Sequence, residues 1–198
     1  MTRHSNNHDT IADNGDLHQA LQTLRQGGLI LYPTDTVWGL GCDATSAEAV
    51  EKLRKLKGRT AGKALLCIVG NEAILDRYVD GVPDVAYELI DTTIEPLTII
   101  YDKGKGFAPG VCGTDGSIGI RIIQSGFTGE LARRFGKPIV STSANMAGEI
   151  TPANFNQISE SLCEKVDYVV RTGQEESDER MPSHIIRLTA SGLFKIIR

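Results

Sequence analysis

The sequence predicts one α/β domain: a single-domain twisted mixed sheet with flanking helices. Helical and strand-like hydrophobic patterns alternate along the whole chain, and no repeat, linker or low-complexity tract interrupts them. The 198 residues, 40% hydrophobic and 23% charged, match the size and composition of one globular domain. Such a chain can bury a core large enough to fold without disulfides or structural metals.

The first elements follow from local patterns. Apolar residues at helical spacing predict a helix over 17–24, and two glycines follow it. The apolar run 29–32 then predicts a short buried strand. A second helix is predicted to begin with a capping box, in which the Thr45 hydroxyl and the Glu48 carboxylate bond each other's backbone N–H groups. Gly58 is placed to end that helix.

The remaining elements continue the alternation. Apolar and β-branched runs predict strands, and amphipathic spacing predicts helices. The predicted strands are 64–69, 97–101, 118–123, 139–140, 167–171, 183–188 and 193–197, and the predicted helices are 129–135 and 155–163.

Composition and charge argue against several classes of protein. A net charge of −4 argues against a protein that binds nucleic acid over its whole surface. The four cysteines are scattered, which argues against zinc and disulfide sites and suits the reducing cytoplasm. The apolar runs are far shorter than the roughly 20 residues of a membrane span. Residues 1–10 lack the apolar part of a signal peptide and are expected to be a flexible extension before the domain at 11–198.

Common catalytic motifs are absent. The sequence has no H-E-x-x-H, G-x-S-x-G or EF-hand pattern, and no metal-ligating residues are predicted. The segment from Lys57 to Ala64 superficially resembles a P-loop. It is not one, because lysine stands where the first glycine belongs and alanine replaces the magnesium-binding Ser or Thr. The segment is also predicted to run from helix to strand, the reverse of a P-loop.

Three cations around the end of the second predicted helix form a candidate site. Lys57, Arg59 and Lys63 have no acidic partners at helical spacing, whereas Lys52 and Lys55 have glutamates four residues before them. Arginine offers a planar fork for phosphate oxygens and lysine a compact charge, so the three could neutralise much of a triphosphate. A solvated helix face is the alternative.

Two other segments place polar groups after predicted strands. Thr34 and Thr36 follow the strand 29–32 with hydroxyls suited to a polar ligand, although an ordinary turn has the same composition. The segment 137–148 contains a strand that ends in three hydroxyls, an amide and a glycine. Open α/β sheets bind ligands at the carboxyl ends of their strands. A Ser/Thr/Asn-rich loop without a ligand is the alternative.

The combination of these segments is more specific than its parts. Y-P-T-D-T-V-W-G-L-G, K-G-R and S-T-S-A-N-M-A-G, in that order, strongly resemble the YrdC/TsaC family of threonylcarbamoyl-adenylate synthases, over Leu17 to Arg198. The chain has the length of the short, single-domain family form. The resemblance implies a twisted α/β sheet around a large concave basic cavity. It also implies that L-threonine, bicarbonate and ATP react to threonylcarbamoyl-AMP and pyrophosphate, for a transferase complex that modifies the tRNA adenosine next to the anticodon.

The resemblance also implies roles for individual residues, each by its position relative to the family's motifs. The expected catalytic residues are Lys57, Arg59, Ser143 and Asn145. The expected ATP-binding residues are Arg59, Lys63, Ser117, Ser143, Thr151 and Arg198. The expected threonine-binding residues are Thr36, Ile68, Arg121, Ser141 and Ser183. Mg²⁺ is expected to accompany the ATP phosphates, held by few protein ligands.

The chain departs from the family pattern at three places. The family often has P-G-P where this chain has Ile94-Glu95-Pro96, often a polar residue in place of Ile68, and usually a proline in place of Ile123. These departures leave open a divergent paralogue with weak synthase activity. The other alternative is an RNA-binding, ribosome-maturation protein of the same fold, against which the acidic net charge argues. Weak tRNA or RNA binding is compatible with each interpretation.

Overall fold

A computed structural model describes residues 14–58, 64–176 and 182–198. The predicted flexible extension at 1–10 and two predicted ATP-binding residues, Arg59 and Lys63, lie outside these ranges. Within the described ranges, no helix is long and apolar enough to cross a lipid bilayer.

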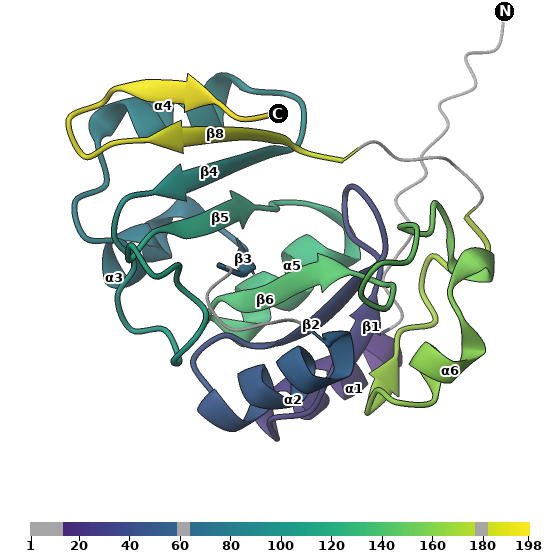
Figure 1. Cartoon of the computed structure of the whole chain (residues 1–198). Helices are drawn as coiled ribbons and strands as arrows, with labels where there is room; N and C mark the ends of the chain where they lie inside the picture. Colours follow the sequence, from purple (N-terminus) through teal and green to yellow (C-terminus); the bar gives the residue numbers. More distant parts are fainter. Residues whose placement is uncertain (1–13, 59–63, 177–181) are drawn as a thin grey trace, which may run out of the picture.

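The described residues form one nine-stranded twisted sheet in the order β7-β1-β2-β6-β3-β5-β4-β8-β9 (Figure 1). Three neighbouring pairs are parallel (β1/β7, β3/β5 and β4/β8) and the other five are antiparallel, so the predicted mixed sheet is confirmed. The strands are β1 (Ile30–Tyr32), β2 (Gly39–Asp43), β3 (Leu66–Val69), β4 (Leu97–Tyr101), β5 (Ile118–Ile122), β6 (Ile139–Ser143), β7 (Tyr168–Val169), β8 (His184–Leu188) and β9 (Phe194–Ile196).

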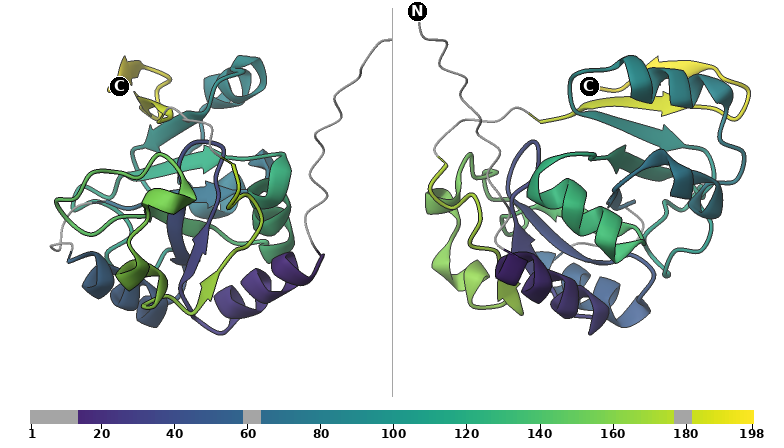
Figure 2. Two further views of the ribbon diagram at one scale, coloured as in Figure 1. Left: turned by 90° about the vertical axis from the view of Figure 1, so that its right-hand side faces the viewer. Right: turned by 180° about the vertical axis from the view of Figure 1, so that it is seen from behind.

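Helices pack on both faces of the sheet. On one face, α2, α3 and α4 cover an apolar core to which β2–β6 and β8 contribute. On the other face, α1 and α5 lie side by side over a second apolar cluster that includes Ile68 and Ile139 (Figure 2). The helices are α1 (Asn14–Arg25), α2 (Ala47–Lys57), α3 (Leu75–Tyr78), α4 (Asp84–Thr92), α5 (Gly126–Phe135) and α6 (Glu160–Cys163), with 3-10 turns at Glu72–Ile74 and Phe155–Gln157.

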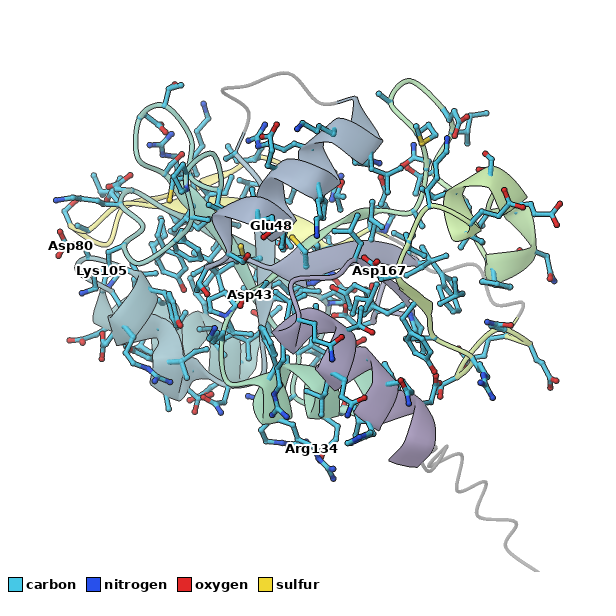
Figure 3. The ribbon with its side chains drawn as sticks, turned by 90° about the horizontal axis from the view of Figure 1, so that it is seen from below. Asp43, Glu48, Asp80, Lys105, Arg134 and Asp167 are labelled. Carbon is cyan, nitrogen blue, oxygen red and sulfur yellow. The ribbon has the colours of Figure 1, made fainter. Side chains whose placement is uncertain are left out.

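The start of α2 differs from the prediction. Ser46 is its N-cap, and the Ser46 hydroxyl accepts a hydrogen bond from the Ala49 N–H at 3.3 Å. Thr45 instead donates its hydroxyl to Asp43 at 2.6 Å, and Glu48 forms an ion pair with a lysine one turn later. Asp43 and Glu48 are labelled in Figure 3. The capping-box prediction is therefore wrong, because the Asp43 carboxylate at the end of β2 takes the Thr45 hydroxyl. The predicted end of the helix is confirmed, since Gly58 is left-handed with a φ of 58°.

Three other predictions about elements need correction. The predicted helix over 155–163 is broken into a 3-10 turn and the short α6, because the chain between them is extended. Helix α5 begins at Gly126, three residues before the predicted start. The buried strand β2 (Gly39–Asp43) and the helix α4 were not predicted at all.

Candidate active site

The central strands present polar side chains to one face of the sheet. The isoleucines at 118 and 120 point into the core under α2–α4, so Gly119 and Arg121, which alternate with them, point to the opposite face. Strand pairing places Thr98 of β4 opposite Arg121, and places Ser141 of β6 in the same row as Gly119. The alternation of isoleucines thus determines which side of β5 is available for polar contacts.

Arg121 is at the centre of a buried polar cluster. Its side chain is 5% exposed, its Nη1 donates to the Thr36 hydroxyl at 3.0 Å, and its Nη2 lies 3.3 Å from Asp35 Oδ1. Among the described residues, the Arg121 Nε–H has no hydrogen-bond partner. Buried donors in proteins are almost always paired, so this N–H indicates an acceptor that the protein itself does not provide.

The electrostatics around Arg121 favour an anion. Burial lowers the pKa of the Arg121 guanidinium, and the positive charge of Arg198 lowers it further, while Asp35 opposes both effects. Arginine nevertheless stays protonated in proteins. Arg121 therefore experiences a second positive charge from Arg198 as well as the negative charge of Asp35, and a bound anion would offset the repulsion between the two guanidinium groups.

Hydroxyl groups surround this cationic centre. The Thr34 hydroxyl donates to the Val37 carbonyl at 2.6 Å and accepts from the Thr36 N–H at 3.1 Å, which fixes the turn that carries Thr36. Across the sheet, Thr98 and Ser183 share a hydrogen bond between their hydroxyls at 2.9 Å. Thr98 was not among the predicted site residues, although its place one strand over from Arg121 could have been inferred from strand alternation.

Two glycines allow side chains to enter this cluster. A Cβ atom on Gly41 would lie 2.7 Å from the Tyr32 ring, and one on Gly39 would lie 3.0 Å from the Ser141 hydroxyl. Any larger residue would displace Tyr32 or Ser141 from the polar face. The glycines in the motif W-G-L-G therefore make room for protein side chains.

A second polar group lies where β6 ends. Lys57, at the end of α2, is 6% exposed, and its ammonium donates to the Ser143 carbonyl at 2.8 Å and to Asn145 Oδ1 at 3.0 Å. It also donates to the Asn145 carbonyl. These contacts use three donors, and an ammonium group has three. In this structure Lys57 thus holds the loop after β6, which differs from the sequence interpretation of a cation available to phosphates.

The same loop fixes the orientation of Ser143 and Asn145. The Ser143 hydroxyl donates to Asn145 Oδ1 at 2.5 Å, and Asn145 Nδ2 donates to the Glu149 carbonyl at 2.6 Å. The amide oxygen of Asn145 therefore faces both Ser143 and Lys57. This arrangement presents the Ser143 oxygen, a hydrogen-bond acceptor, rather than its proton.

The predicted site residues fall into two groups, and some lie apart from both. The Arg121 centre contains four predicted residues: Thr36, Arg121, Ser183 and Arg198. Of these, Arg198 donates to the Ser183 carbonyl at 3.0 Å. Three others lie at the end of β6: Lys57, Ser143 and Asn145. Ser141 lies between the groups along β6, and Ser117 precedes β5.

Ile68 adjoins the Arg121 centre, because it pairs with Arg121 across β3 and β5 and the two side chains lie on the same face of the sheet. Its side chain is fully buried in the apolar cluster under α1 and α5. Thr151 is exposed in the loop between β6 and the 3-10 turn at Phe155–Gln157. Across the described ranges, no three His, Cys, Asp or Glu residues are grouped closely enough to hold a metal ion.

Comparisons with known proteins show what the chain as a whole is similar to. A family profile named Sua5_yciO_yrdC, described as telomere recombination, matches residues 22–198. Threonylcarbamoyl-AMP synthase of Pseudoalteromonas translucida is 32% identical over 163 residues, which cover 81% of this chain and 87% of the relative. The synthase of the same name from Stenotrophomonas maltophilia is 38% identical over 136 residues, which cover 67% and 73%.

Solved structures share the fold. A variant of P. abyssi Sua5 aligns with a TM-score of 0.79 at 26% identity, covering 87% of this chain and 53% of that one. P. abyssi Sua5 complexed with L-threonine has a TM-score of 0.78 at 24% identity, covering 87% and 50%. The chain therefore spans about half the length of these structural relatives.

Proposed function

The chain belongs to the Sua5/YciO/YrdC family, and on that premise we propose that it is a threonylcarbamoyl-AMP synthase. The reaction joins L-threonine, bicarbonate and ATP into threonylcarbamoyl-AMP and releases pyrophosphate. The shared name of the curated relatives, which the chain matches over most of their length, supports this function over the RNA-binding alternative.

The buried Nε–H of Arg121, which has no hydrogen-bond partner in the part of the chain that the structure describes, is the observation that carries the threonine half of the proposal. A carboxylate accepts hydrogen bonds from a guanidinium in a fixed planar geometry, so the α-carboxylate of an amino acid suits this donor. It would also balance the second positive charge, that of Arg198. The hydroxyls of Thr36 and of the Thr98–Ser183 pair lie around the same centre and suit the polar groups of threonine.

We assign the ATP half to the group at the end of β6. Ser143 and Asn145 are oriented there by Lys57. The family resemblance adds Arg59 and Lys63, whose cations would neutralise the phosphates, together with Thr151. Mg²⁺ would accompany the phosphates mainly through phosphate and water oxygens, as this ion prefers.

The chemistry requires positioning and charge stabilisation more than a protein nucleophile. The threonine nitrogen bonds the carbon of bicarbonate with loss of water, giving an N-carboxylate. An oxygen of that carboxylate then bonds the α-phosphorus of ATP, and the bond from this phosphorus to the β-phosphate oxygen breaks. Holding two anions in contact and stabilising the departing pyrophosphate are the tasks of the Arg121 centre and the cations.

We place the protein in the cytoplasm, where its product would pass to a threonylcarbamoyl-transferase complex acting on tRNA. Incubation with ATP, bicarbonate and L-threonine, followed by mass spectrometry, should reveal threonylcarbamoyl-AMP. Serine in place of threonine should support much slower pyrophosphate release, and Arg59→Ala should nearly abolish turnover in a folded protein. Absence of the adenylate from the wild-type reaction would refute the proposed activity.

A further inference from the structure

Strand β9 lies at one of the two edges of the sheet. Among the described residues it pairs only with β8, in an antiparallel register that sets Ile196 opposite Ile186 and Phe194 opposite Leu188 (Figure 1). An open sheet edge presents backbone N–H and C=O groups to which another strand can bond. β9 is therefore a place where an extended segment can be added to this sheet.

The hydrogen bonds to β8 show which backbone groups of β9 face the open edge. The Thr189 N–H donates to the Leu193 carbonyl at 2.8 Å, which makes these two residues a bonded pair of the ladder. Bonded and non-bonded pairs alternate along antiparallel strands, so Lys195 also bonds β8, whereas Phe194 and Ile196 do not. The N–H and C=O groups of Phe194 and Ile196 consequently point towards the open edge.

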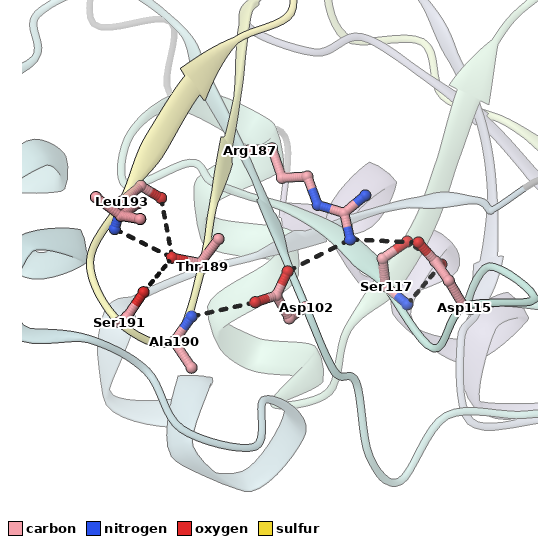
Figure 4. A network of polar contacts seen from close by, with 8 residues as sticks. All are labelled: Asp102, Asp115, Ser117, Arg187, Thr189, Ala190, Ser191 and Leu193. Carbon is pink, nitrogen blue, oxygen red and sulfur yellow. Dashed lines mark hydrogen bonds and ion pairs between the residues drawn. The ribbon is translucent and has the colours of Figure 1, made fainter.

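The turn that leads into β9 is held by side-chain hydrogen bonds. The Thr189 hydroxyl bonds the Ser191 hydroxyl at 2.9 Å and accepts from the Leu193 N–H at 3.1 Å (Figure 4). The Ala190 N–H donates to Asp102 at 3.2 Å. A strand that is held in place before a partner arrives loses little conformational freedom on binding. The open edge is thus preorganised.

Two apolar side chains of β9 extend the core face of the sheet beyond its helices. Phe194 and Ile196 share a face with their cross-strand partners Leu188 and Ile186, which are buried in the core under α2, α3 and α4. Phe194 is nevertheless 62% exposed and Ile196 69% exposed. Four of the six large apolar side chains that are exposed in the described ranges lie within 193–197, so the exposure is concentrated at this edge. Such a concentration is typical of a surface that a partner covers.

Lys195 carries the charge of this edge. Its side chain lies on the face opposite Phe194 and Ile196, beside its cross-strand partner Arg187. The nearby acids are taken by Arg187, which contacts one carboxylate on β4's side and one before β5, each at 3.3 Å (Figure 4). Lys195 itself forms no ion pair within the described part of the chain. An exposed cation thus lies between the two apolar residues of the edge.

This charge selects between two kinds of incoming strand. If a second copy of the chain paired all the outward backbone groups of Phe194 and Ile196 with its own, Lys195 would lie opposite Lys195 of that copy. Like charges directly opposite destabilise a pair of strands, and edge lysines commonly prevent self-pairing. An acidic residue at that position would instead attract Lys195.

We propose that β9 is a docking edge for an extended segment of another protein, in which an acidic residue lies between two apolar residues. The segment adds antiparallel to β9, with its acid opposite Lys195 and its apolar residues opposite Phe194 and Ile196. The outward backbone groups supply hydrogen bonds, the apolar pair supplies burial, and Lys195 excludes a second copy of this chain.

The test follows amide hydrogen exchange by NMR, with the end-blocked peptide Thr-Val-Glu-Val-Thr as the probe. At about ten times the dissociation constant, exchange of the Phe194 and Ile196 amides should slow about 10-fold, whereas the Lys195 amide, already bonded to β8, should change little. A peptide with lysine in place of glutamate should bind about 10-fold more weakly, because attraction becomes repulsion. Lys195→Glu should reverse that preference.

Variants of the edge separate its parts. Phe194→Ser combined with Ile196→Ser should weaken peptide binding about 10-fold through loss of apolar contact. Ile150→Ser is the matched control, because Ile150 is an exposed apolar residue in the loop after β6, and this variant should bind as the wild type does. Lys195→Val should dimerise in sedimentation experiments at concentrations where the wild type is monomeric, since the repulsion between copies is gone.

Three results would overturn the inference. Unchanged exchange of the Phe194 and Ile196 amides at high peptide concentration would remove the docking edge. Equal affinity for the glutamate and lysine peptides would remove the selection by Lys195. Wild-type dimers that Phe194→Ser dissociates would assign the edge to a second copy. None of these measurements uses ATP or threonine, so the proposed function is judged separately by its own assay.

Discussion

Replacement of Lys57 by methionine tests whether this residue acts by holding the loop after β6. Methionine is flexible and of similar length, so the side chain can stay in the buried space at the end of α2. The variant removes the ammonium and its bonds to the Ser143 carbonyl and to the carbonyl and amide oxygens of Asn145. These acceptors then depend on water.

The structure allows an estimate of the cost. A hydrogen bond from a charged donor contributes about 1.5–3 kcal/mol, and an abandoned buried acceptor costs about 1–3 kcal/mol. Asn145 is only half-buried, so water can replace part of what is lost. We therefore expect Lys57→Met to lower the free energy of unfolding by about 2–4 kcal/mol. A domain of ordinary stability survives such a loss.

Activity should fall further than stability. If the loop moves by even about 1 Å, the rate is expected to drop about 100-fold, because Ser143 no longer has a fixed orientation. Threonine-dependent pyrophosphate release measures kcat/KM, and urea denaturation measures stability.

The double variant with Asn145→Ala separates positioning from direct contact. If Lys57 acts through Asn145, the double variant should be no less active than the worse single variant. Losses that multiply, or a Lys57→Met protein that binds tripolyphosphate much more weakly than Asn145→Ala does, would refute the reasoning and assign Lys57 to the phosphates. Wild-type kcat/KM in folded Lys57→Met would refute both roles.

Three other perturbations have expected results. Arg121→Met should raise the KM for threonine about 100-fold, because a buried charge that pairs with the substrate is lost; titration of threonine at saturating ATP measures this, and an unchanged KM would contradict the assignment. Gly119→Ala should keep wild-type stability, since its new Cβ would meet side chains only at 3.7 Å, but it should weaken substrate binding. Gly70→Ala should lose about 3 kcal/mol of unfolding free energy, because the backbone of α5 lies against Gly70. Denaturant titration of both variants tests the contrast, which equal stabilities would refute. Burial acts to raise the pKa of the Asp16 carboxyl, but hydrogen bonds from Tyr168 and from residues 171 and 172 together lower it. The contribution of Asp16 to the stability of the fold is therefore present above the unfolded pKa of about 3.8. It is lost as the pH falls through the lower folded pKa. Asp16→Asn should flatten that acid limb of the stability curve, and an unchanged limb would argue against the assignment.

The sequence by itself determined the fold class and much of the local structure. The run 118–123 identified the strand β5, whose alternating isoleucines face the apolar core because side-chain direction in a strand has a period of two residues. Gly58 identified the end of α2. Helices commonly end at a residue in the left-handed conformation, which glycine adopts without steric cost. The ordered motifs indicated which segments carry the site. These features depend on neighbours in the chain, which a sequence displays directly.

Tertiary structure decided which polar groups meet. Thr45 bonds Asp43 instead of capping α2, and Lys57 bonds the loop after β6. Thr98 joins the polar cluster through Ser183. In each case, partners far apart in sequence or from different elements compete for a limited number of donors and acceptors. The outcome of that competition depends on distances that only the folded sheet fixes, and so the sequence indicated candidate segments while the fold set their contacts.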